Sequence, residues 1–224
     1  MPWMAAGFLV ALAIAAVILA AFSAGKPGTV LALRLTARWG FLLFWPAYAG
    51  SALAKLFGRR FGAAPFVGFL ARRGREFGLA FAAALCVHIA LVLWLLHIEA
   101  VIGDMIFFWG AAFAACLLAL FSVRRLRDAL APPVWRVLQT IALDYIALAF
   151  AADFIVAPLR ASGLYKPTYL PFAALLIAGG ALRLAAFARG WLVARRSFTT
   201  ATPPRCGLPG RRRARRVRRG ARTG

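Results

Sequence analysis

Long apolar runs, separated by short segments rich in arginine, glycine and proline, dominate the hydropathy pattern of this chain. A helix of about 20 apolar residues crosses a hydrocarbon core of ~30 Å, because each residue adds ~1.5 Å. The pattern therefore predicts an all-α, polytopic membrane protein with six transmembrane helices in a bundle. The predicted helices are residues 3–22, a second helix that has Arg34 and Arg38 at its entry and its apolar part at 39–56, and then residues 76–98, 105–123, 134–156 and 168–193.

Proline and glycine mark the ends and the weak points of these helices. Pro132 and Pro133 start the fifth helix, where a missing backbone N–H costs little. Pro46 lies inside the second helix and predicts a kink there. Gly179 and Gly180 in the sixth helix would let a neighbouring helix approach closely.

The first apolar run has two interpretations. One is a transmembrane helix, and the other is a signal peptide cleaved near Ser23 and Ala24. The run lacks a basic segment in front of it and is longer than the usual apolar part of a signal peptide. We therefore favour the transmembrane helix.

Composition agrees with a membrane protein and argues against a soluble one. Of the 224 residues, 63% are hydrophobic, and the mean hydropathy is +0.80. A soluble domain of this composition would lack polar residues to cover its surface. The net charge of +22 predicts no specific nucleic-acid partner, because many arginines flank apolar runs, as is usual on the cytoplasmic side of membrane proteins.

The basic residues also predict the orientation. Six helices place both chain ends, the segment 58–75 and the segment 124–131 on one side of the membrane. That side holds most of the arginines, whereas the other carries Lys26, Arg34, Arg38, Arg160 and Lys166. The positive-inside rule then predicts that both termini are cytoplasmic.

The end of the chain changes character. Residues 1–25 hold the first helix, residues 26–196 the other five, and residues 197–224 an arginine-rich tail that we expect to be disordered. The tail would be attracted to anionic lipid. A solvated anchor for the topology, or an extension without a function, is the simpler interpretation, and we favour it.

One histidine near the middle of the third helix, His88, is the main candidate for chemistry, since ionisable groups at this depth are costly and usually have a partner. Cys86, Cys116 and Cys206 have no metal-binding spacing. No nucleophile–base pair, phosphate-binding glycine loop or flavin or nicotinamide domain is visible. Any reductase activity of the chain would therefore need a partner oxidoreductase.

Three stretches of the chain resemble segments of one family and occur in the same order as in that family. In chain order they are Thr36-Ala37-Arg38-Trp39, then Arg72-Arg73-Gly74-Arg75-Glu76-Phe77-Gly78 with His88 ten residues later, and then Val134-Trp135-Arg136-Val137-Leu138-Gln139. Together they are similar to the ferric-reductase-like transmembrane proteins, in particular the haem-binding membrane subunits of bacterial periplasmic methionine sulfoxide reductase systems. The resemblance covers about residues 31–190.

The resemblance implies a bundle that holds b haem between its third and fifth helices through axial histidines. It also implies electron transfer from a cytoplasmic or quinone donor to the outer face. The positions of the two fifth-helix histidines correspond here to Gln139 and to Ala152 or Asp153. Gln139 and Asp153 are fourteen residues apart and fall near one face of an ideal helix, ~21 Å apart.

His88 accordingly has three interpretations. It is a haem ligand, a histidine hydrogen-bonded to a neighbouring helix, or a partner of Asp144, which we expect at a similar depth in the fifth helix. His97 lies near the membrane boundary and on the opposite helix face from His88. The functional alternatives are a haem electron carrier, a haem-free structural or assembly partner, and a small proton-coupled transporter that uses His88 and Asp144.

Overall fold

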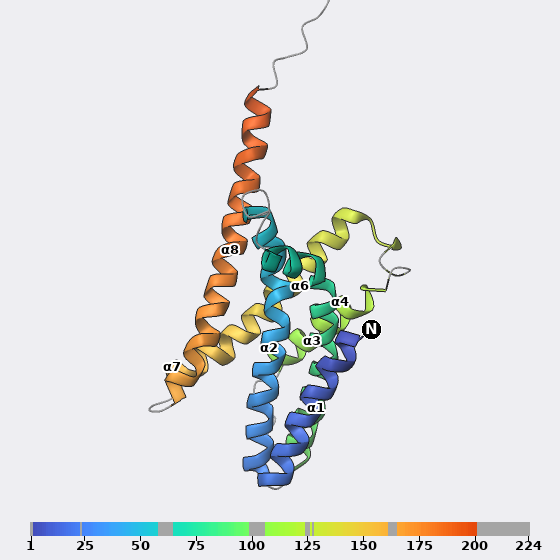
Figure 1. The fold of residues 1–224 in the computed structure, drawn as a ribbon, viewed down its shortest axis with the longest axis vertical. Coiled ribbons are helices and arrows are strands. Elements are labelled where there is room, and N and C mark those ends of the chain that lie inside the picture. The colour runs from blue at the N-terminus through green and yellow to red at the C-terminus, as the bar shows by residue number, and fades with distance from the viewer. Residues whose placement is uncertain are drawn as a thin grey trace, which may run out of the picture. The chain divides into compact units, whose positions relative to one another are not determined.

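The computed structural model describes residues 2–22, 24–57, 65–98, 106–123, 126, 128–160 and 165–200. These residues are helical almost throughout and contain no strand, which confirms the all-α prediction. The elements are α1 Pro2–Phe22, α2 Lys26–Phe57, α3 Pro65–Ile98, α4 Ile106–Leu120, α6 Pro132–Ala151, the π-helical segment η1 Ala152–Val156, α7 Ala157–Arg160 and α8 Tyr165–Thr200 (Figure 1).

Four helices among the described residues are long and apolar enough to cross a membrane. They are Pro2–Phe22, Arg72–Ile98, Pro132–Leu159 and Pro167–Val193. α2 is long but carries Arg34, Arg38 and Lys55, and α4 is only 15 residues long. An integral membrane protein with several spans is therefore supported, and the number six stays a prediction.

Two predicted boundaries were wrong. Residues 65–75 belong to α3 and not to a connector, because arginine, leucine and alanine favour a helix once Pro65 has started it. α8 continues beyond residue 193 to Thr200, so the first residues of the predicted tail are helical. Residues 201–224 lie outside the described part of the chain.

The chain divides into two compact units, residues 1–188 and 189–224. In the first unit, α2 lies beside both α1 and α3 (Figure 1). Small residues allow α1 to approach α3: a Cβ added to Gly7 would stand 2.5 Å from the carbonyl oxygen of Ala80. Ala11 and Ala15, one and two turns further along α1, are also buried. The indole of Trp39 donates a hydrogen bond of 3.2 Å to the Gly7 carbonyl and ties α2 to the same contact.

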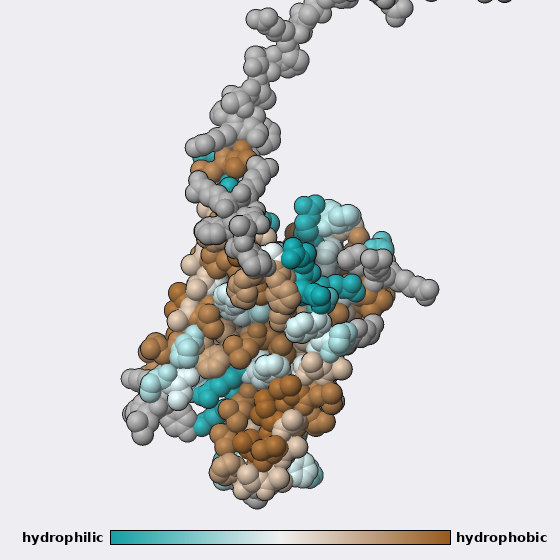
Figure 2. Space-filling view, in the orientation of Figure 1, coloured by the Kyte–Doolittle hydropathy of each residue, from teal (hydrophilic) through white to brown (hydrophobic). Residues whose placement is uncertain are grey.

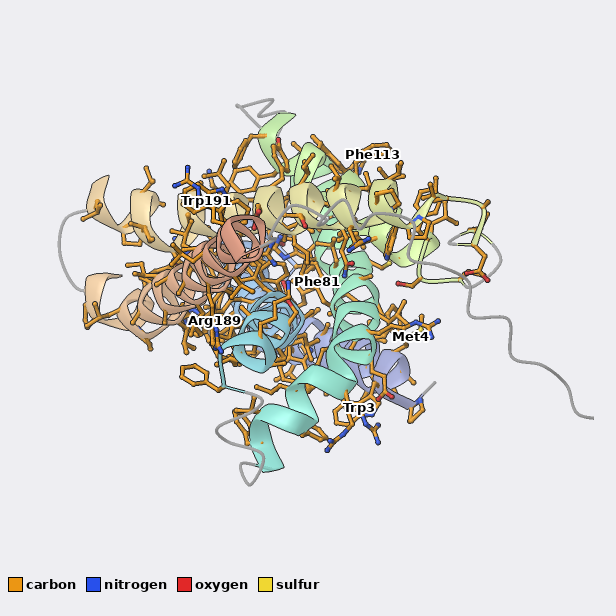
Figure 3. The ribbon with its side chains drawn as sticks, turned by 90° about the horizontal axis from the view of Figure 1, so that it is seen from above. Trp3, Met4, Phe81, Phe113, Arg189 and Trp191 are labelled. Carbon is orange, nitrogen blue, oxygen red and sulfur yellow. The ribbon has the colours of Figure 1, made fainter. Side chains whose placement is uncertain are left out.

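Phenylalanine rings fill the centre of this unit. Phe41 on α2 is fully buried, and its ring centroid lies 5.2 Å from those of Phe150 on α6 and Phe154 on η1. Edge-to-face pairs of this kind add about 0.5–1.5 kcal/mol each beyond burial. Phe81 of α3 joins the cluster from between the helices, whereas Phe113 of α4 points outward (Figure 3).

The outer surface is apolar, as a lipid-facing surface requires. Large hydrophobic side chains such as Val17, Phe113, Leu170 and Leu184 are between 65% and 72% exposed. Figure 2 shows this apolar surface over much of the visible face of the described residues. Soluble monomers rarely expose so large an apolar area to water. The hydrocarbon core of a bilayer solvates such a surface.

Candidate functional site

His88 has a partner on α2. Its Nδ1 lies 2.9 Å from the hydroxyl oxygen of Thr36, which is itself buried. The same oxygen is 2.9 Å from the Ala32 carbonyl and 3.1 Å from the Leu33 carbonyl. The hydroxyl has a single proton, which it can donate to one of these carbonyls while its oxygen accepts from the Nδ1–H of His88. We assign this tautomer from the hydrogen-bond network; it leaves Nε2 unprotonated.

An apolar cavity of about 290 Å³ opens beside His88. We call it the His88 cavity. Four helices form its walls: α2, α3, α4 and α6, followed by η1. Its lining is mostly aliphatic and aromatic, and its polar side chains are Arg34, Thr36, His88, Asp153 and the indole of Trp109. An imidazole with an available nitrogen therefore stands on the wall of a cavity inside the helical bundle.

Asp153 also lines the His88 cavity, and it lies where the α-helix changes to a π-helix. Residues 152–156 form the π-helical segment η1, in which the N–H of Ala157 bonds to the carbonyl of Ala152. Such segments widen a helix by one residue and often occur at functional sites. Asp153 interacts electrostatically with Arg38 and Arg34 on α2.

Arg38 lies against α8. Its guanidinium donates a hydrogen bond of 3.4 Å to Thr168 and stands 4.9 Å from the ring centroid of Tyr169. Its buried Nε has no partner among the described residues. Several ionisable groups therefore lie close together around the His88 cavity. They are Arg34 and Arg38, the carboxylate of Asp153, and His88 with its partner Thr36.

Gln139, at the first of the two fifth-helix ligand positions, does not face the His88 cavity. Gln139 lines a separate cavity of about 500 Å³, which is bordered by α2, α3, α4, α6 and α8 and by the residues that follow α4. We call this the basic cavity. Phe81 and Ile146 line both cavities and stand between them. An ideal helix would place Gln139 and Asp153 near one face. In the structure the two residues line different cavities.

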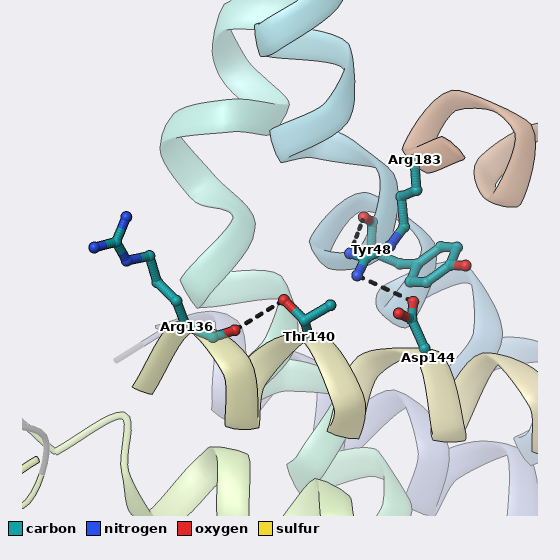
Figure 4. A network of polar contacts seen from close by, with 5 residues as sticks. All are labelled: Tyr48, Arg136, Thr140, Asp144 and Arg183. Atoms are coloured by element: carbon teal, nitrogen blue, oxygen red, sulfur yellow. Dashed lines mark hydrogen bonds and ion pairs between the residues drawn. The ribbon is translucent and has the colours of Figure 1, made fainter. Parts of the chain in front are cut away.

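Asp144 is paired with Arg183 and not with His88. The Arg183 guanidinium lies 3.0 Å from a carboxylate oxygen of Asp144, donates a 3.4 Å hydrogen bond to the Tyr48 carbonyl, and stands 4.7 Å from the Tyr48 ring centroid (Figure 4). The sequence did not reveal this pair, because Asp144 and Arg183 lie on different helices whose contact hydropathy does not predict. The pair removes Asp144 as the acidic partner that a His88 proton relay would use.

Gly179 leaves room for two aromatic side chains of α2. A Cβ added to Gly179 would stand 3.2 Å from the indole nitrogen of Trp45 and from the ring of Tyr48, whereas one added to Gly180 would make only an ordinary contact with Tyr48 at 3.9 Å. Trp45 in turn donates a 2.7 Å hydrogen bond to the Leu175 carbonyl. The contact between α8 and α2 at Gly179 is therefore made through side chains.

The remaining candidates stay apart from the cavities. The ring of His97 lies 5.8 Å from the ring of Trp94 near the end of α3. Cys86 and Cys116 are exposed, and the Sγ of Cys86 donates to the Ala82 carbonyl. Within the described ranges, no three histidine, cysteine, aspartate or glutamate side chains are grouped as metal ligands.

Comparison with known proteins adds no relative: no protein-family model, curated protein or solved structure matches this chain. The functional argument therefore rests on the residues and on their geometry.

Proposed function

We propose that this integral membrane protein is a b-haem electron-transfer subunit in which His88 is the axial ligand supplied by the chain. The observation that carries the proposal is the imidazole fixed by Thr36 on the wall of an apolar cavity between four helices. Bound haem supplies one-electron chemistry, and a bundle can present a ligand to the face of a flat macrocycle.

The hydrogen bond between His88 and Thr36 is the arrangement that a metal-ligating histidine needs. A ligating imidazole usually donates its other N–H to an oxygen, which fixes both the tautomer and the ring orientation. Thr36 is such an oxygen at 2.9 Å, and Nε2 is then the ligating atom. Arg34 is the cationic side chain on the cavity wall and would hold a carboxylate of the cofactor.

The cavity has to widen to hold a macrocycle. Its volume of about 290 Å³ is close to the lower limit of ~300 Å³ for pockets that bind drug-sized ligands. Phe108 and Trp109 of α4 form one wall and are 44% and 39% exposed. These side chains can turn outward toward lipid without opening the phenylalanine cluster on the other side of the cavity.

Ligation through one histidine distinguishes this proposal from the arrangement that the family resemblance implies. Asp153 is the carboxylate on the His88 cavity, and a carboxylate is not a usual axial ligand of b haem. Gln139 lines the basic cavity instead. The proposal therefore assigns one protein ligand, His88, which would hold the haem if it is bound.

The distribution of arginines supports the orientation that the proposal assigns to the protein. Both termini are cytoplasmic in a bacterial inner membrane, and a partner oxidoreductase on one side exchanges electrons with the subunit. The partner is necessary because the chain has no sequence stretch suited to a flavin or nicotinamide domain.

The test is an absorption spectrum of the detergent-purified protein, expressed with added haem precursor and measured with and without dithionite. The proposal predicts a reduced α-band in the wild type that is lost in His88→Ala and kept in His97→Ala. A spectrum without this band, or a band that survives in His88→Ala, would refute it.

The second candidate is a haem-free structural or assembly partner in the membrane. It is favoured by one observation, namely that Gln139 and Asp153 stand at the two ligand positions and lie on different cavities. The same spectrum decides between the candidates, since a haem-free partner shows no band even in haem-supplemented cells.

A further inference from the structure

The basic cavity has a chemistry that neither electron transfer nor haem binding requires. Four basic side chains from four helices line it: Lys55 from α2, Arg75 from α3, Arg136 from α6 and Arg183 from α8. No described lining residue is acidic. Cations that converge on a cavity without carboxylates repel one another unless an anion is bound among them.

Pairing within the chain neutralises only part of this charge. Arg183 is paired with Asp144 at 3.0 Å. Arg75 donates a 2.6 Å hydrogen bond to the Ser122 carbonyl, and the Nε of Arg136 lies 3.4 Å from the Pro132 carbonyl. Carbonyls satisfy hydrogen-bond donors without cancelling their charge. Arg75 and Arg136 thus have no carboxylate partner in the described part of the chain.

Hydroxyl and amide groups stand among the cations. Ser51, Ser122, Gln139 and Thr140 line the cavity together with the arginines. Arg136 and Thr140 lie one turn apart on α6, and the Thr140 hydroxyl donates to the Arg136 carbonyl, as Figure 4 shows. Planar guanidinium groups and hydroxyls are the groups that proteins use to hold phosphate oxygens.

The other end of the cavity is apolar. Phe44, Phe81, Leu143 and Ile146 form its inner wall, toward the phenylalanine cluster. The cavity volume of about 500 Å³ exceeds what a phosphate group alone would fill. A ligand with a phosphate at one end and a hydrocarbon chain at the other matches both ends of the cavity.

We propose that the basic cavity binds the phosphate group of an acidic phospholipid, with the start of its acyl chain against the apolar wall. Lys55 lies in the last turn of α2 and Arg136 near the start of α6, and Arg75 lies at the start of the apolar span Arg72–Ile98 of α3. The positive-inside rule places these three positions at the cytoplasmic leaflet. Basic pockets between transmembrane helices on that side are known to take lipid headgroups.

The test measures lipid binding to the full-length chain by native mass spectrometry from detergent micelles. Phosphatidylglycerol and phosphatidylcholine are titrated separately onto the wild type and onto Arg75→Gln/Arg136→Gln. We expect the wild type to bind phosphatidylglycerol about tenfold or more tightly than phosphatidylcholine. Both lipids carry the phosphate, but the choline cation of phosphatidylcholine is repelled by the basic side chains of the cavity. The double variant should lose this preference.

Two controls separate the site from general charge and from misfolding. Arg72→Gln removes an exposed arginine of the same helix that does not line the cavity, and it should keep the preference. Arg75→Lys/Arg136→Lys keeps the charge and should retain most of the binding. Equal binding of the two lipids by the wild type, or equal loss in Arg72→Gln and in the double glutamine variant, would overturn the proposal.

A third arm identifies the source of the phosphate. Inorganic phosphate at millimolar concentration is added to the wild-type complex with phosphatidylglycerol. Retained lipid supports a phospholipid site that also uses the apolar wall. Displacement of the lipid by inorganic phosphate would overturn the lipid assignment and leave a site for free phosphate.

Discussion

The hydroxyl of Thr36 has an unusual number of neighbours for a side chain inside a membrane helix. It lies within hydrogen-bond distance of two carbonyls of its own helix and of the His88 ring. A polar group that can satisfy itself locally and also bridge to a second helix costs little to bury. Thr36 therefore fixes His88 and at the same time links α2 to α3.

Replacing Thr36 with valine tests this link. Valine keeps the shape of threonine and removes the hydroxyl, so His88 loses its hydrogen bond to α2. We expect Thr36→Val to lower the free energy of unfolding in detergent by about 1 kcal/mol. Thr36→Ser keeps the hydroxyl and should retain the greater part of the stability. Equal unfolding of Thr36→Val and wild type would show that the bond contributes nothing.

The ion pair of Asp144 and Arg183 gives a second test on the residue scale. Either single change, Asp144→Asn or Arg183→Gln, leaves a charge without its partner, whereas the double change leaves none. A double-mutant cycle on thermal unfolding should therefore show a coupling energy of about 1 kcal/mol, with the double variant less destabilised than the sum of the single variants. Strict additivity would mean that the two groups do not interact.

On the scale of elements, the contact of α1 with α3 depends on the absence of a side chain at Gly7. A Cβ there would meet backbone atoms of Ala80, and backbone cannot turn aside as a flexible side chain can. We expect Gly7→Ala to destabilise the protein by about 1–3 kcal/mol through overpacking.

Gly190 provides the matched control for this substitution. Nothing lies within 4 Å of a Cβ added at Gly190, which is also helical. Gly190→Ala should be neutral, or stabilising by up to ~1 kcal/mol through helix propensity. Thermal unfolding of both variants in the same detergent is the measurement. A Gly7→Ala variant as stable as Gly190→Ala would contradict the packing of α1 on α3.

The sequence was enough to predict which segments form helices, but not which helices contact one another. Apolar runs gave the main helices, and Pro132 and Pro133 stand at the first turn of α6 as predicted. The π-helical turn at Asp153 and the contact of Arg183 with Asp144 depend on how helices meet in space. Hydropathy along one chain holds no information on these contacts. His88 was found because it is a rare residue at membrane depth, but its partner Thr36 is unremarkable in the sequence.

For the whole molecule, the distribution of arginines predicts a topology that reporter fusions can test. A green fluorescent protein joined after residue 200 should fluoresce, and alkaline phosphatase at the same place should be inactive, because the positive-inside rule predicts that this end is cytoplasmic. Phosphatase joined after residue 100 or residue 162 should be active on the outer side. Active phosphatase after residue 126 would contradict the six-helix topology.

The haem content of the purified protein tests the central claim most directly. Pyridine haemochrome assays on wild type, His88→Ala and His97→Ala, all expressed with added haem precursor, give moles of haem per mole of chain. The account predicts about one haem in the wild type and in His97→Ala, almost none in His88→Ala, and recovery of His88→Ala when imidazole is supplied. Equal haem content in wild type and His88→Ala, or none in any of them, would contradict it.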